Sequence, residues 1–103
     1  MKKLGSCTLL AWVVWLHSTG ILRSESKERW SIMGSYDTKQ ECDSTIPSRV
    51  EFFKNTMAKE HPEAKITVKG ENTVETLWPE GTLTDSTLIC LPDTIDPRPR
   101  AKP

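Results

Sequence analysis

The sequence predicts a small exported α+β domain in which one central helix packs on a two- or three-stranded antiparallel sheet and one disulfide holds the fold. Three observations support this. The N-terminus carries an apolar run of the secretory type, apolar residues recur at helical spacing after Cys42, and Cys42 and Cys90 fall on the helix and on the last expected strand.

Residues 1–20 have the pattern of a signal peptide. Lys2-Lys3 gives a basic start, residues 9–16 form an uncharged apolar run, and Ser18 and Gly20 are small residues suited to signal peptidase. We therefore predict cleavage before Ile21.

Two other interpretations of this leader remain open. An uncleaved membrane anchor over residues 4–22 approaches the roughly 20 residues that a spanning helix needs. Lipidation of Cys7 is disfavoured, because a lipidated cysteine follows the apolar run and Cys7 precedes it.

A stabilising cross-link is expected in the mature chain, because the core of a chain of about 80 residues buries too little surface to give a large free energy of unfolding by itself. After cleavage the chain keeps two cysteines, Cys42 and Cys90, which allow one pairing in an oxidising compartment.

The mature chain divides into three parts. Residues 21–29 are polar without a period and predict a flexible lead-in. The folded domain is expected over residues 30–92. It opens with a strand from Trp30 to Tyr36, in which Gly34 marks a bulge or a close approach. Residues 93–103 form a proline- and arginine-rich tail, expected to be extended.

The central helix is predicted to begin at a capping box made by Thr38 and Glu41 and to run to about Lys59. Pro47 interrupts it, and proline inside a helix costs about 3 kcal/mol. Either one helix kinks there, or a short turn ends near Asp43 and a second helix begins; we favour the break. One face of the helix is apolar, at Cys42, Ile46, Val50, Phe53 and Met57.

Two further strands are expected, a short edge strand over residues 65–70 and a last strand from residue 84 or 86 to 91, with a turn at residues 78–81 before the latter. Phe52 is expected at the margin of the core. The predicted core consists of Cys42, Cys90, Trp30, Ile32, Ile66, Val68, Phe53 and Val50.

Two segments together resemble a family of small exported bacterial proteins of uncharacterised function. The first is the Tyr36-Asp37-Thr38 helix start leading to Cys42, and the second is Cys90 followed by Asp96-Pro97-Arg98. The resemblance implies secretion, a bacterial origin and the Cys42–Cys90 bridge. It implies no active-site residues.

Charge and residue types exclude several classes of function. Lysine plus arginine equals aspartate plus glutamate, 14 each, which leaves no basic footprint for nucleic acid. His61, the one histidine beyond the leader, lies in a charged helix end, where we expect it to be dispensable. No spacing of cysteine and histidine residues predicts a metal or cofactor site. The sequence also offers no set of a nucleophile, a base and an orienting group such as nucleophilic catalysis needs.

We therefore expect a secreted or periplasmic, non-enzymatic interaction or structural module that binds an envelope or extracellular protein. Once the leader is cleaved, no membrane contact is expected. An inhibitor or accessory subunit of a secreted enzyme is the alternative, followed by a small envelope enzyme. The candidate partner contacts are Trp78, Arg98 and Arg100.

Overall fold

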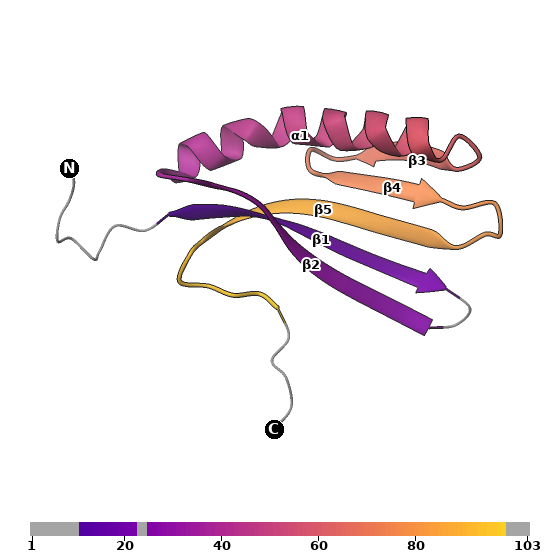
Figure 1. Ribbon diagram of the computed structural model, residues 1–103, viewed down its shortest axis with the longest axis horizontal. Helices are drawn as coiled ribbons and strands as arrows, with labels where there is room; N and C mark the ends of the chain where they lie inside the picture. Colours follow the sequence, from indigo (N-terminus) through magenta and orange to yellow (C-terminus); the bar gives the residue numbers. More distant parts are fainter. Residues whose placement is uncertain (1–10, 23–24, 99–103) are drawn as a thin grey trace, which may run out of the picture.

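The computed structural model describes residues 11–22 and 25–98. One helix lies across a five-stranded antiparallel sheet whose strand order is β2-β1-β5-β4-β3 (Figure 1). The elements in chain order are β1 (Trp12–Leu22), β2 (Glu25–Tyr36), α1 (Lys39–Glu60), β3 (Lys65–Lys69), β4 (Thr73–Leu77) and β5 (Leu83–Pro92).

The predicted α+β class, the single helix and the Cys42–Cys90 disulfide are confirmed, but the predicted size of the sheet is wrong. Two of the five strands account for the difference. β4 comes from a mostly polar stretch in which Val74 and Thr76 share the buried face, and β1 comes from the apolar run that resembled a leader.

β1 is an inner strand, paired with β2 on one side and with β5 on the other. Its side chains alternate between two covered faces. Val14 is fully buried in the core beneath α1, and Trp15, on the next position, is 4 % exposed against Trp30 and Arg98. A strand buried on both faces is a continuous apolar run, which explains why the first residues of β1, 12–16, also fit the apolar run of a signal peptide.

Three expectations about the N-terminal region are therefore corrected. Residues 21–29 are not a flexible lead-in, because β2 begins at Glu25. The folded domain does not begin at Trp30 but includes β1 from Trp12. The spanning helix considered over residues 4–22 is also wrong for this structure, because Trp12–Leu22 is a strand, and no helix in the described chain is long and apolar enough to cross a membrane.

α1 is one continuous helix, so the favoured break at Pro47 is wrong and the alternative of one helix holds. The capping box is confirmed: the Glu41 backbone N–H donates to the Thr38 hydroxyl at 3.0 Å, and Glu41 Oε1 accepts from the Thr38 N–H at 3.2 Å. Cys42 and Val50, one on either side of Pro47, are both buried against the sheet. Packing therefore keeps the two halves in line and outweighs the cost of the proline.

The core lies between α1 and the sheet and is crossed by the disulfide. Three residues predicted for the core are not in it: Trp30 is half-buried on the helix-free face, Ile32 is 58 % exposed and Val68 is 38 % exposed. Ile32 pairs with Trp15 and therefore shares the helix-free face, whereas Val68 lies on the edge strand β3. The buried cluster is Val14, Cys42, Val50, Val74 and Leu88, with Phe53, Ile66 and Cys90 partly buried against it.

The described part of the tail folds back instead of running free. The Asp93 N–H donates to the Ala11 carbonyl at 2.8 Å, and the Ile95 N–H donates to the Pro92 carbonyl at 2.9 Å, which turns the chain below the sheet (Figure 1). Arg98 then lies over the ring of Trp15 on the helix-free face, 5.4 Å from the ring centroid. The expectation of an extended tail is therefore wrong for residues 93–98.

Truncation tests the position of β1. A chain that begins at Ile21 lacks β1 and should show no cooperative thermal transition by circular dichroism, because β2 and β5 lose their shared neighbour. A chain that begins at Ala11 keeps every described strand and should unfold cooperatively. A sharp transition and β-sheet spectrum in the shorter chain would contradict this arrangement.

The disulfide should account for much of the stability. It closes a segment of 48 residues, for which the chain-entropy model gives about 4 kcal/mol. We expect Cys42→Ser and Cys90→Ser to lower the free energy of unfolding in urea by about this amount. The double variant should be no less stable than either single one, and unchanged urea midpoints would refute the estimate.

Candidate functional site

Trp78, predicted as a partner contact, lies over the edge of the core. Its indole N–H donates to the Thr84 hydroxyl at 3.0 Å, and its ring meets His61 edge-on with centroids 4.9 Å apart. The turn predicted around it is confirmed, because the Gly81 N–H donates to the Trp78 carbonyl at 2.8 Å. These contacts give Trp78 a structural role, and contact with a partner stays a prediction.

Arg98 is held within its own chain. Its guanidinium donates to both carboxylate oxygens of Asp96, at 2.8 and 2.6 Å, and this pairing raises the pKa of Arg98 above its usual value. Arg100, the third predicted contact, lies outside the described residues. Trp78 contacts Thr84 and His61, whereas Arg98 contacts Asp96 and Trp15, so the structure does not bring these two predicted residues into one site.

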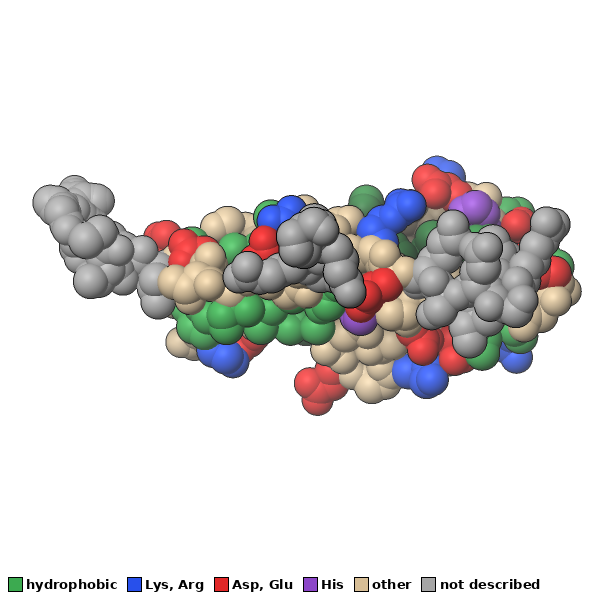
Figure 2. Space-filling model, turned by 90° about the horizontal axis from the view of Figure 1, so that it is seen from below, with side chains coloured by type: hydrophobic (Ala, Val, Ile, Leu, Met, Phe, Trp, Pro, Cys, Tyr) green, Lys and Arg blue, Asp and Glu red, His purple; other side chains and the backbone are tan. Residues whose placement is uncertain are grey.

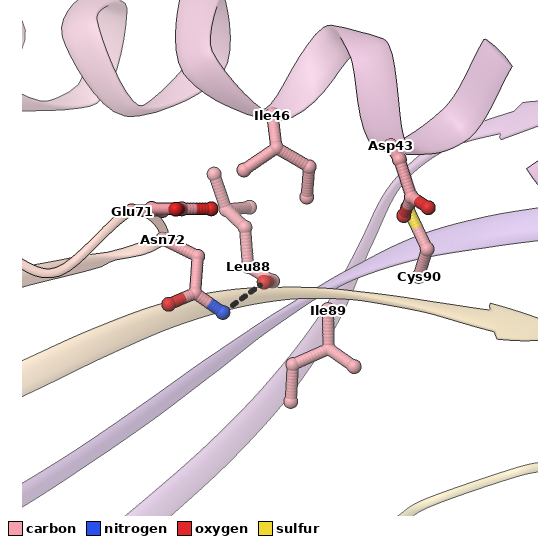
Figure 3. Close-up of a pocket in the computed structure, with 7 residues that line it drawn as sticks. All are labelled: Asp43, Ile46, Glu71, Asn72, Leu88, Ile89 and Cys90. Carbon is pink, nitrogen blue, oxygen red and sulfur yellow. Dashed lines mark hydrogen bonds between the residues drawn. The ribbon is translucent and has the colours of Figure 1, made fainter. Parts of the chain in front are cut away.

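One cleft opens between the first half of α1 and β5, beside the point where β4 begins (Figure 3). It encloses about 610 Å³ and has mixed walls. Its polar groups are already partnered or exposed: Asp43 pairs with Lys39 at 2.7 Å, Asn72 Nδ2 donates to the Leu88 carbonyl at 3.0 Å, and Glu71 faces solvent. Its lining is Asp43, Ile46, Glu71, Asn72, Leu88, Ile89 and Cys90.

A second cleft, which we call the α1–β2 groove, runs between the second half of the helix and the β1–β2 side of the sheet. It encloses about 270 Å³ and is almost entirely apolar. Phe52 and Met33 on its walls are 72 % and 40 % exposed. Figure 2 views the molecule from the side opposite α1 and shows a separate hydrophobic patch on the helix-free face. The groove is lined by Leu16, Met33, Ser48, Arg49, Phe52, Phe53, Thr56 and Leu88.

Arg49 supplies the one charge in the wall of this groove. Its Nη2 donates to the Tyr36 hydroxyl at 2.6 Å, and its guanidinium lies 5.9 Å from the centroid of the Tyr36 ring. Its Nε is buried without a hydrogen-bond partner, and among the described residues no carboxylate pairs with it. A buried donor left unpaired costs about 1–3 kcal/mol. The positive charge of the guanidinium would favour a carboxylate bound at this wall.

Gly34 makes room for Arg49. A Cβ at this position would lie 2.6 Å from Arg49 Nη2, so a side chain on Gly34 would push the guanidinium away. The pairing of β1 with β2 shifts by one residue here, and Gly34 pairs with Val14 while Trp15 pairs with Ile32. The predicted bulge or close approach at Gly34 is confirmed, and its consequence is that the arginine can cross the edge strand.

No pattern in the sequence points to this groove. Phe52 is expected at the margin of the core, and it is exposed there. Nothing in the sequence marks Arg49 or Met33 as site residues, and Arg49 occupies an ordinary polar position of an amphipathic helix. The spacing of Phe52 three residues after Arg49 places both on neighbouring positions of the helix surface. That pair is the only local hint, and it is common in helices without a site.

The described residues contain no group of three or more metal-ligating side chains. Comparisons with known proteins add no assignment: no family model, curated protein or solved structure matches this chain. The α1–β2 groove is therefore the candidate site on its own geometry.

The titration of Tyr36 tests that geometry. The hydrogen bond from Arg49, and secondly one with Thr45, lowers the pKa of Tyr36 below its ordinary value of about 10. Because the pKa of Tyr36 is lower in the folded chain than in the unfolded chain, ionisation of Tyr36 stabilises the fold. This stabilisation is complete above the ordinary tyrosine pKa and is lost as the pH falls through the pKa of the folded state.

Arg49→Gln should move the midpoint of the tyrosinate absorbance upward, toward the ordinary value. Gly34→Ala should do the same while keeping the charge, because it displaces the guanidinium. Tyr36 is the single tyrosine, so the signal is unambiguous. A midpoint unmoved by both variants would show that Arg49 does not bond Tyr36 in solution.

Proposed function

We propose that this chain is a small, non-enzymatic interaction module that binds another envelope or extracellular protein through the α1–β2 groove. The observation that carries the proposal is an uncovered apolar groove whose one charged wall residue, Arg49, has no carboxylate partner among the described residues. Exposed apolar surface next to an arginine is typical of protein contact sites, in which aromatic and arginine side chains dominate the binding energy.

An extracytoplasmic location, secreted or periplasmic, is part of the proposal. It is supported by the Cys42–Cys90 disulfide, because such bonds persist in oxidising compartments. Cleavage near Gly20 would remove most of β1, so the location is proposed without cleavage at that position.

The residue types near the groove support binding over catalysis. Both cysteines of the described chain are joined in the disulfide. His17 pairs with Glu28 at 2.6 Å and stacks on Trp30, and His61 meets Trp78 edge-on. Neither histidine lines the groove, and nucleophilic catalysis needs a base within hydrogen-bond reach of its nucleophile.

Photo-crosslinking tests the proposed surface. We would replace Phe52 with the photoreactive benzoylphenylalanine and irradiate its own host cells. The matched control carries the same group at Ala58, which is exposed on another face of α1. We expect one protein adduct in high yield from position 52 and little from position 58.

The captured protein should then bind the purified, oxidised chain in a fixed stoichiometry. Phe52→Ser should weaken that binding by about tenfold or more, since it removes an exposed aromatic anchor, while Ala58→Ser should leave it unchanged. Equal adducts from both positions, or binding unaffected by Phe52→Ser, would refute the groove as the contact surface.

A further inference from the structure

β2 offers an open backbone edge beside the groove. It is a 12-residue strand at one end of the sheet, paired with β1, and no other described strand pairs with its second edge. An edge strand presents unpaired N–H and C=O groups to which an extended chain can bond. Ile32 and Met33 on this strand are exposed, at 58 % and 40 %.

The groove lies where an added strand would place side chains. Met33 belongs to β2 and lines the groove, while Ser48, Arg49 and Phe52 form the helical wall opposite it. Successive side chains of a strand point to opposite faces of the sheet. Every second side chain of a strand added to β2 would therefore face α1, and one of them would enter the groove.

Size and charge define what the groove can take. Its 270 Å³ falls below the roughly 300–1,000 Å³ of pockets that enclose a small ligand, and it suits one large apolar side chain. Arg49 lacks a carboxylate partner among the described residues, and its half-buried side chain lines the groove. A carboxylate two positions from the apolar residue would face the same wall and supply the acceptor.

We propose that the partner of this module contributes an extended segment that adds as a strand to the free edge of β2, with an apolar side chain in the α1–β2 groove and an aspartate or glutamate two residues away paired with Arg49. The inference rests on the proposed function and specifies its recognition mode. Backbone hydrogen bonds along β2 give the affinity, and the groove with Arg49 gives the sequence preference.

Random 12-residue peptides displayed on phage and selected against the immobilised, oxidised full chain test this mode. We expect enrichment of an apolar residue followed or preceded two positions away by aspartate or glutamate. A synthetic enriched peptide should protect β2 amides from hydrogen exchange. Alternate N–H groups of the bound peptide point toward β2. N-methylation at these alternate positions should therefore abolish binding, and N-methylation at the positions between them should not.

Ser48 allows a matched pair of variants on the groove wall. Ser48 is exposed, so neither replacement should disturb the fold. Ser48→Glu places a negative charge beside Arg49 and should weaken binding of the enriched peptide by at least tenfold. Ser48→Gln, whose side chain has the shape of glutamate without the charge, should change the affinity by less than twofold. The effect of Ser48→Glu should diminish at high salt.

The outcomes separate this inference from the proposed function. Strand addition is overturned if Ser48→Glu leaves peptide affinity unchanged, or if N-methylation at every position leaves binding intact. This holds even if the photoreactive group at position 52 crosslinks a partner. No enrichment, with binding of a fatty acid in the groove or pairing of two copies through β2, also overturns it. Enriched peptides that meet every criterion, with no partner captured at position 52, would sustain the recognition mode and refute the proposed cellular role.

Discussion

The fold depends on β1 being covered on all sides. Its two edges are paired with β2 and β5, and its two faces are buried, Val14 under α1 and Trp15 under Arg98 and against Trp30. Without it, β2 would have no sheet partner in the described chain, and β5 would lose one of its two neighbours. The disulfide acts on this frame from the helix side, joining α1 to the β5 residue that pairs with Val14.

The same arrangement creates the groove. α1 is held to β5 near its start by the Cys42–Cys90 bridge, and the sheet twists away beneath its second half. Part of the helix-facing surface of β1 and β2 therefore stays uncovered, and Phe52 projects past the core. Arg49 spans the gap only because Gly34 has no side chain, so the bulged edge strand and the candidate site share one local cause.

Local chemistry was readable from the sequence, and tertiary context was not. The capping box at Thr38, the apolar face of the helix and the turn before β5 depend on short-range patterns and followed from them. The disulfide followed from the cysteine count, because two cysteines allow one pairing. β1 was misassigned because a short apolar run fits an export leader and an inner strand equally well, and only its pairing partners distinguish the two. The Pro47 break failed because packing of Cys42 and Val50 outweighed local preference.

The candidate site lay beyond sequence reasoning for a related reason. A tryptophan in a polar stretch, Trp78, and a proline-rich tail containing Arg98 predicted partner contacts, but each of the two side chains has a partner within the chain, Thr84 and Asp96. Arg49 and Met33 are unremarkable in sequence. They become a site because a helix and an edge strand meet there without covering one another.

Hydrogen exchange of the backbone amides of the intact, oxidised chain tests the central claim most directly. If β1 is the inner strand, the amides of Val14 and Trp15 should be among the slowest in the protein and should exchange only through global unfolding, at the same free energy as Leu88 in β5. Exchange of Val14 and Trp15 at rates typical of an unfolded chain, while β5 stays protected, would contradict the account.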